Sequence, residues 1–229
     1  MFFDPLYLVF LAPAILLGLW AQWRVTSAYQ RASQIPVTTG VSGAQAAAGI
    51  LRDSGVRGVG IELVPGQLTD HYDPSEKVLR LSPDVYRGRS VAAVGIAAHE
   101  AGHALQDAHQ YPLLGLRNGL VPLANLGGSI GWLMIAIGLV LSLSGLIWAG
   151  IAVFSATVLF QLVNLPVEFD ASRRARAELV GTGLVAEREE PEVARVLNAA
   201  ALTYVAATLT SILTLVYFLF RAGQSSSDE

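Results

Sequence analysis

Cysteine is absent from this chain of 229 residues. Its absence excludes a disulfide framework and every metal site that is built on thiolates. A bound metal ion would therefore have to be held by histidine, aspartate or glutamate. Such ligands are more typical of catalytic than of structural zinc sites.

Charge is also scarce, because charged residues make up only 14% of the chain while hydrophobic residues make up 53%. A soluble globular domain has about 25% charged residues. The net charge of −3 comes with no basic patch interleaved with aromatic residues, so nucleic acid is not a predicted partner. This composition indicates a membrane protein whose main environment is the lipid bilayer.

Four uncharged stretches are long enough to cross a hydrocarbon core. The predicted spans are residues 6–23, 124–141, 146–163 and 199–220. The first span has neither the basic start nor the cleavage site of a signal peptide. The second and third lie between Arg117 and Glu168, where no charged residue or histidine occurs, with a turn at Ser142–Gly145. We expect Pro166 to end the third span.

The basic residues predict the orientation of these spans. Nine of the fifteen lie in the segment 24–119 and five lie in the segment 164–198. With four spans these two segments share one side, and the positive-inside rule places them in the cytoplasm. The expected protein is a multi-pass protein of the cell membrane with both termini outside and a short polar tail at 221–229.

The segment between the first two spans has signals for a small folded region. Residues 42–54 resemble a short helix, and residues 59–64 and 77–81 alternate like strands, with turn residues between them. The sheet could offer an edge to an extended substrate or could merely pack a helix. The predicted fold is mainly α: one polytopic membrane domain, 1–229, with about four transmembrane helices and a small α+β cytoplasmic region that carries a short β-sheet.

A His-Glu-x-x-His motif stands at His99-Glu100-Ala101-Gly102-His103. Ser90 and the alanine-rich run that follows it predict a helix here, without proline until Pro112. Residues four apart share a helical face, so both imidazoles could hold one zinc ion with Glu100 beside it. Two unrelated histidines that happen to be four apart are the alternative.

A catalytic zinc usually has a third protein ligand, which here must be His, Asp or Glu. Glu168 and Asp170 follow the third span and begin an expected helix at Leu165. Glu168 should therefore lie near the same membrane face as the motif helix. The alternative is that these carboxylates only stabilise the start of a helix through its dipole.

The sequence resembles a known family at this point, the membrane zinc metallopeptidases typified by YugP. The matching stretches are residues 68–74, 81–82, 85–86, 97–107 and 165–175. More distantly, the layout is similar to HtpX and to the integral-membrane prenyl-protein proteases, in which a glutamate on a later helix completes the site. With the arrangement of spans, the resemblance covers nearly the whole chain.

The resemblance implies that His99, His103 and Glu168 bind one zinc ion and that Glu100 is the general base. The distant relatives have Glu-x-x-x-Asp where this chain has Glu168 and Ser172. Because of this departure, the residue that hydrogen-bonds the metal ligands is not assigned, and Asp170 is the candidate to replace the aspartate of the relatives.

A donor for the developing oxyanion is also expected, and His71 and Arg173 are the candidates. His71 stands in a polar cluster, Asp70-His71-Tyr72-Asp73, and its alternative role is a hydrogen bond within a turn. Arg173 could instead anchor the chain at lipid headgroups.

The predicted function is a zinc-dependent endopeptidase that acts on peptides or membrane proteins near the cytoplasmic membrane face. The alternative is a non-enzymatic scaffold or adaptor that keeps a structural metal, which would have no use for Glu100. A transporter is less favoured, because the spans carry no ionisable residue. Cleavage within the membrane is disfavoured too, because His99 lies well before the second span.

Overall fold

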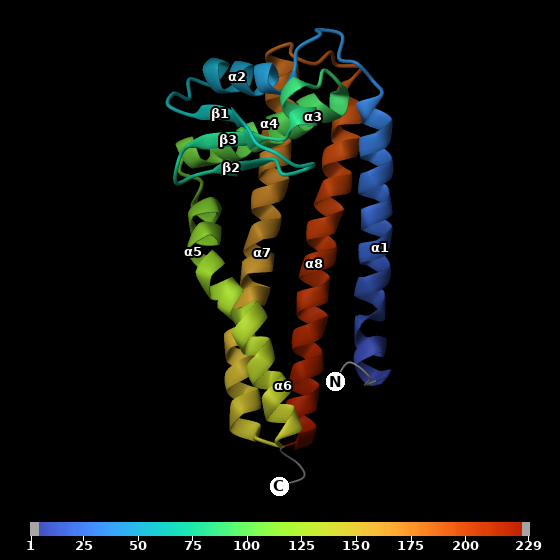
Figure 1. Cartoon of the computed structure of the whole chain (residues 1–229), viewed down its shortest axis with the longest axis vertical. Helices are drawn as coiled ribbons and strands as arrows, with labels where there is room; N and C mark the ends of the chain where they lie inside the picture. Colours follow the sequence, from blue (N-terminus) through green and yellow to red (C-terminus); the bar gives the residue numbers. More distant parts are fainter. Residues whose placement is uncertain (1–4, 226–229) are drawn as a thin grey trace. The chain divides into compact units, whose positions relative to one another are not determined.

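The computed structural model describes residues 5–225 (Figure 1). The elements in chain order are α1 (Pro5–Ser33), α2 (Gly43–Asp53), β1 (Gly60–Leu63), β2 (His71–Asp73), β3 (Val78–Leu81), α3 (Pro83–Arg87), α4 (Val91–Ala108), α5 (Pro112–Leu126), the π-helical turn η1 (Gly127–Gly131), α6 (Trp132–Val140), α7 (Ser144–Gly181) and α8 (Glu190–Ser225). Residues 226–229 of the predicted polar tail lie outside the described residues.

Four helical stretches within the described residues are long and apolar enough to cross a membrane. They are Pro5–Ser33, Pro112–Val140, Ser144–Gly181 and Glu190–Gln224. Three of them include a predicted span and continue beyond it, while Pro112–Val140 begins before the predicted span 124–141 and ends one residue short of it. Together with the small sheet, they confirm the prediction of a mainly α polytopic membrane protein.

The chain divides into two compact units. Among the described residues, the first unit comprises 5–21, 115–166 and 202–225, and the second comprises 22–114 and 167–201. The first unit holds the most apolar parts of the four long helices. The second unit holds the sheet and the motif helix.

In the first unit, close helix contacts depend on small residues. A side chain at Gly131 would meet backbone of Phe154, 2.8 Å away, and one at Gly150 would meet the Gly131 carbonyl oxygen at the same distance. Thr157 Oγ1 donates to the carbonyl oxygen of Ala124, 2.9 Å away, just before the π-helical turn. Backbone segments therefore approach closely where glycine and threonine permit it.

The helix does not end at Pro166 as expected, because α7 continues through this residue to Gly181. An internal proline costs a helix about 3 kcal/mol. Beyond Pro166, one face of α7 is almost fully buried at every fourth residue, at Val167, Ala171, Ala175 and Leu179. This packing outweighs the cost of the proline. Glu168 thus lies in the middle of a helix, so the helix-dipole alternative does not apply to it.

The second unit is built around α4. The predicted helix at 42–54 is α2, and Ser42 and Gln45 form a reciprocal capping box at its start. Ser90 caps α4 by accepting from the Ala93 N–H, 3.2 Å away. Alanines dominate the buried positions of α4, which lets neighbouring elements pack close to its backbone.

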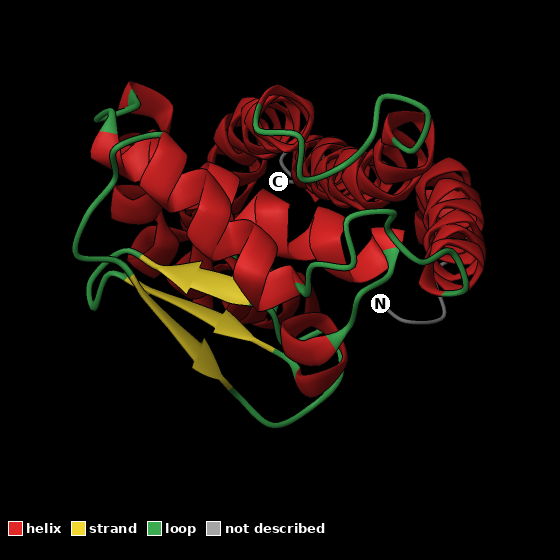
Figure 2. Cartoon of the chain, turned by 90° about the horizontal axis from the view of Figure 1, so that it is seen from above, coloured by secondary structure: helices red, strands yellow, loops and turns green. Residues whose placement is uncertain are grey.

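The sheet has the strand order β1-β3-β2, and Figure 2 shows its strands side by side in one layer. β1 pairs in parallel with β3, and β2 pairs antiparallel with β3. β1 and β3 correspond to the predicted strands at 59–64 and 77–81. β2 was not predicted, because its three residues lie among turn residues and are too few to show alternation.

Candidate metal centre

The second unit brings two histidines of α4 and one glutamate of α7 together. Glu168 Oε2 lies 3.2 Å from His99 Nε2 and 3.6 Å from His103 Nε2. One ligand atom from each residue lies within 4.8 Å of the others. The donors of a tetrahedral zinc ion are about 3.3 Å apart, as follows from bond lengths near 2.0–2.1 Å. The two distances from Glu168 are close to this value, and the three side chains form a group that could hold one metal ion.

Gly102, inside the motif, sets the distance between α4 and α7. A side chain at this position would lie 2.5 Å from the carbonyl oxygen of Ala171. Ala171 is one helical turn beyond Val167 and is fully buried. Only a glycine lets the backbone of α7 come close enough for Glu168 to reach the imidazoles.

Gln106 orients the ring of His103 from behind. It is fully buried, and its amide nitrogen donates to the carbonyl oxygen of Val167 at 2.8 Å and to Asp170 at 3.0 Å. Both partners can only accept, so the amide oxygen must face His103 Nδ1, 3.0 Å away. Nδ1 then carries the proton, which leaves the Nε2 lone pair free to bind a metal.

His99 has an analogous partner in Ser172, whose Oγ lies 3.1 Å from His99 Nδ1. The serine thus occupies the supporting place for which Asp170 was the candidate. Asp170 instead supports Gln106 and pairs with Arg173 and Arg174. Each imidazole is therefore held through Nδ1 while its Nε2 faces Glu168.

The charge of the cluster suits a divalent cation. The side chains of Glu168 and His103 are 4% and 11% exposed, so little water screens them. Burial lowers the pKa of His103, but the hydrogen bond and charge of Glu168, with smaller contributions from Glu100 and Gln106, raise it more, and the net shift is upward. Without a metal, the site therefore favours a proton on the imidazole, and a bound cation would satisfy the same demand for positive charge.

Glu100 is also buried, but its carboxylate is held by the sheet. Its Oε2 accepts a hydrogen bond from the backbone N–H of Tyr72 in β2, 3.1 Å away. It is not one of the three clustered ligands. A carboxylate that lies beside a metal site without filling it is free to exchange a proton.

The two candidate oxyanion donors lie outside the cluster. His71 is exposed, and its Nδ1 lies 2.8 Å from the carbonyl oxygen of Thr69, a hydrogen bond within the loop. The side chain of Arg173 is 78% exposed and pairs with Asp170. Among residues 5–225, no hydrogen bond or ion pair joins either residue to the metal cluster or to Glu100, so a catalytic role for His71 stays a prediction.

Gln106, Ser172 and Tyr72 contact site residues, yet no sequence motif assigned them a role. Gln106 stands one turn after His103, where a partner for the motif histidine can be sought. Ser172 stands one turn after Glu168. Tyr72 adjoins His71 in the polar cluster, which was the available signal for a cleft-lining segment.

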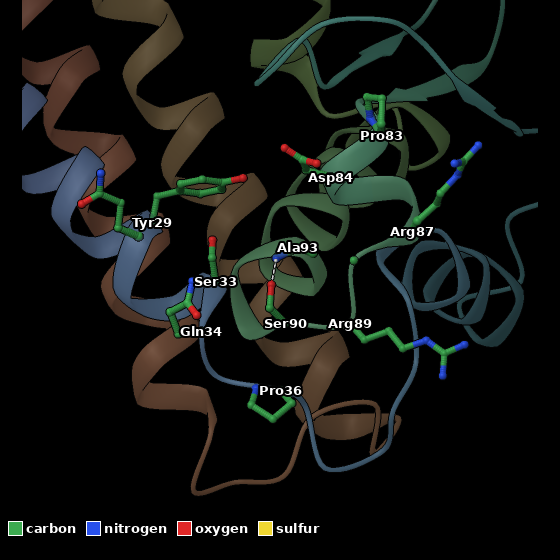
Figure 3. A pocket seen from close by; sticks show the side chains of 12 residues that line it. Tyr29, Ser33, Gln34, Pro36, Pro83, Asp84, Arg87, Arg89, Ser90 and Ala93 are labelled. Carbon is green, nitrogen blue, oxygen red and sulfur yellow. Dashed lines mark hydrogen bonds between the residues drawn. The ribbon is translucent and has the colours of Figure 1, made fainter.

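An open pocket of about 960 Å³ lies elsewhere in the second unit, between the end of α1 and the loop before α4 (Figure 3). Asp84 and Tyr29 line it, while Arg87 and Arg89 extend away from Tyr29. Its lining includes none of the metal-cluster residues.

Known proteins match nearly the whole chain. The family model described as "Putative neutral zinc metallopeptidase" matches residues 7–223. "Putative membrane protease YugP" of Bacillus subtilis (strain 168) is 45% identical over 212 residues, which cover 92% of this chain and 94% of the relative. No solved structure matches. On this family match and this identity, the chain belongs to the neutral zinc metallopeptidase family.

Proposed function

We propose that this protein is an integral-membrane zinc-dependent endopeptidase in which His99, His103 and Glu168 hold the zinc ion and Glu100 is the general base. The observation that carries the proposal is the approach of Glu168 to both imidazoles, although it lies 69 residues after His99. Family membership supports zinc as the metal. The substrate class is a peptide or a membrane protein.

The residues fit zinc in number, donor type and charge. Two neutral imidazoles and one carboxylate are a common set for a catalytic zinc ion, which leaves a fourth position for water or substrate. Gln106 and Ser172 occupy both Nδ1 atoms with hydrogen bonds, so the Nε2 atoms are the ones that face the metal position. Bound zinc would polarise a peptide carbonyl and make water acidic enough to lose a proton near neutral pH.

The chain's own residues then move the proton. Glu100 takes a proton from the water that attacks the peptide carbonyl carbon, and a C–O bond forms. When the C–N bond breaks, Glu100 returns this proton to the leaving amine. His71 is the proposed donor to the developing oxyanion, and replacing it with alanine should lower kcat if that role is correct.

We propose that the site faces the cytoplasm and that both termini lie outside. The support is the distribution of basic residues, of which nine lie in 24–119 and five in 164–198. The second and third predicted spans lie between these two segments. Two successive spans bring the chain back to the side of the membrane from which it started.

The first prediction tests the general base. Glu100→Gln keeps the size of the side chain but cannot accept the proton, so peptidase activity on casein should fall by about 100-fold or more. Zinc content, measured by elemental analysis of the purified protein in detergent, should stay at the wild-type level. Glu168→Gln is the matched variant, because it should lose zinc as well as activity.

A wild-type protein that binds zinc but cleaves no peptide in a zinc-dependent manner would support the scaffold alternative instead. Full activity of Glu100→Gln would refute the base role while leaving the metal site intact.

A further inference from the structure

Tyr72 contacts the same helix at two points. Its backbone N–H donates to Glu100 Oε2 at 3.1 Å, and its hydroxyl donates to Asp107 Oδ2 at 2.5 Å. Glu100 and Asp107 are about two helical turns apart on α4, so they share a face. One residue of β2 therefore spans this face from the proposed general base to the end of the motif helix.

The N–H that holds Glu100 points away from the sheet. β2 is an edge strand, and Tyr72 stands opposite Leu79 of β3. Pro74, which follows the strand, has no N–H to offer. The edge is thus short and its central donor is already bound to Glu100, which leaves little capacity to pair with an extended substrate.

The phenol end of Tyr72 is fixed by charge as well as by hydrogen bonding. Asp107 Oδ2 also pairs with Lys77, which follows the turn between β2 and β3. Burial, followed by the bond to Asp107, raises the pKa of Tyr72 well above its ordinary value. The hydroxyl therefore stays protonated and able to donate at every pH at which the protein would be assayed.

We propose that Tyr72 is a positioning residue for Glu100, and that the Tyr72–Asp107 bond sets where the Tyr72 N–H holds the carboxylate. A glutamate side chain has several rotatable bonds, so a fixed donor at one oxygen restricts it to the position from which it can accept a proton. This inference rests on the proposed function, because it assigns a role relative to Glu100 as the base. The Tyr72 hydroxyl does not bond Glu100, so it acts on the base only through the backbone N–H.

The kinetic test uses Tyr72→Phe, which removes the hydroxyl and keeps the ring. A displaced carboxylate should lower kcat by about 10- to 100-fold, with KM within about twofold and zinc content unchanged. Tyr86→Phe is the matched control, because no hydrogen bond is found for the Tyr86 hydroxyl among residues 5–225. Asp107→Ala should have the same effect as Tyr72→Phe, and the double variant should be no worse than either alone.

A merely structural contact would give a different result. Tyr72→Phe would then lower the thermal midpoint and leave kcat per folded molecule at the wild-type value, which would overturn the proposal. Additive losses of kcat in the double variant would also overturn it, because the two groups would then act separately.

Amide hydrogen exchange at Tyr72 tests the geometry without catalysis. In the full-length protein in detergent, this amide should exchange slowly, and at least about tenfold faster in Glu100→Ala and in Tyr72→Phe. Tyr86→Phe should leave it unchanged. Equal exchange in wild type and Glu100→Ala would refute the positioning role even if the protein cleaved no peptide, so this failure is distinct from that of the proposed function.

Discussion

The hydrogen bonds of Gln106 determine which nitrogen of His103 carries the proton. Its two amide protons are both committed to oxygen atoms that only accept, from Val167 and Asp170. The direction of the amide oxygen, and hence the tautomer of His103, follows without any assumption about the metal. In many zinc sites a carboxylate accepts the hydrogen bond from the histidine ring nitrogen that does not bind the metal. Here the amide oxygen of a glutamine accepts it.

We predict that Gln106→Met lowers zinc affinity by about 10- to 100-fold, which is typical for loss of a group that supports a metal ligand. Methionine fills a similar volume but leaves His103 Nδ1 without its acceptor. Competition with a fluorescent zinc chelator measures the affinity. Gln67→Met is the control, since Gln67 is exposed in the loop before β2. An unchanged affinity would show that the His103 ring is held by packing alone.

At the residue scale, the sequence predicted the motif residues but not the residues that hydrogen-bond the two histidines. His99 and His103 share a face because helical periodicity is local. The partners of Gln106 lie 61 and 64 residues further along the chain. No local pattern carries information about such distant contacts. The serine at 172, which departs from the distant relatives, could be interpreted only once its Oγ was seen beside His99.

At the scale of elements, the approach of α4 to α7 positions the site. Gly102 stands in the motif at a position where the chemistry requires no particular side chain. Its role is steric, because a methyl group there would overlap the carbonyl oxygen of Ala171. Glu168 and Ala171 both lie on the part of α7 that follows Pro166, one helical turn or less apart.

Gly102→Ala should therefore destabilise the protein by about 1–3 kcal/mol, the usual cost of overpacking, although alanine is the better helix former. It should also weaken zinc binding, since α7 must move away and take Glu168 with it. Gly95→Ala on the same helix is the control, because the nearest atom there is a methyl of Val193 at 3.3 Å rather than a backbone oxygen. Thermal midpoints and zinc titrations distinguish the two variants, and equal midpoints would contradict the steric role.

The elements themselves were largely predictable, with two exceptions. Ser42 and Ser90 mark the starts of α2 and α4 because their side chains satisfy N–H groups of the first turn. The expectation that a helix ends at Pro166 was wrong, because the local cost of the proline is outweighed by burial of residues further along α7. β2 was missed because its pairing with β3, and not its composition, makes it a strand.

At the scale of the whole molecule, the open question that can be tested most directly is orientation in the membrane. The chain has no cysteine, so single cysteines can be introduced into a background without thiols. Gln67 and Ser142 are both exposed and stand in segments that the proposed topology places on opposite sides.

We predict that Ser142→Cys in intact cells reacts with a membrane-impermeant maleimide and that Gln67→Cys reacts only after the membrane is permeabilised. The physical basis is the bias of basic residues towards the cytoplasm. Each variant should retain wild-type zinc content as a check on folding. The reverse labelling pattern would place the metal cluster outside the cell.

Hydropathy and periodicity determined, from the sequence alone, that this chain crosses a membrane several times and presents two imidazoles on one helical face, because both properties depend on near neighbours. The family resemblance pointed to Glu168 as the third ligand, but only the tertiary structure gives the physical reason for Glu168 rather than Asp170. Glu168 and Asp170 are two residues apart on α7, so they project in different directions. The packing of α7 against Gly102 turns Glu168 towards the imidazoles and leaves Asp170 to hold Gln106.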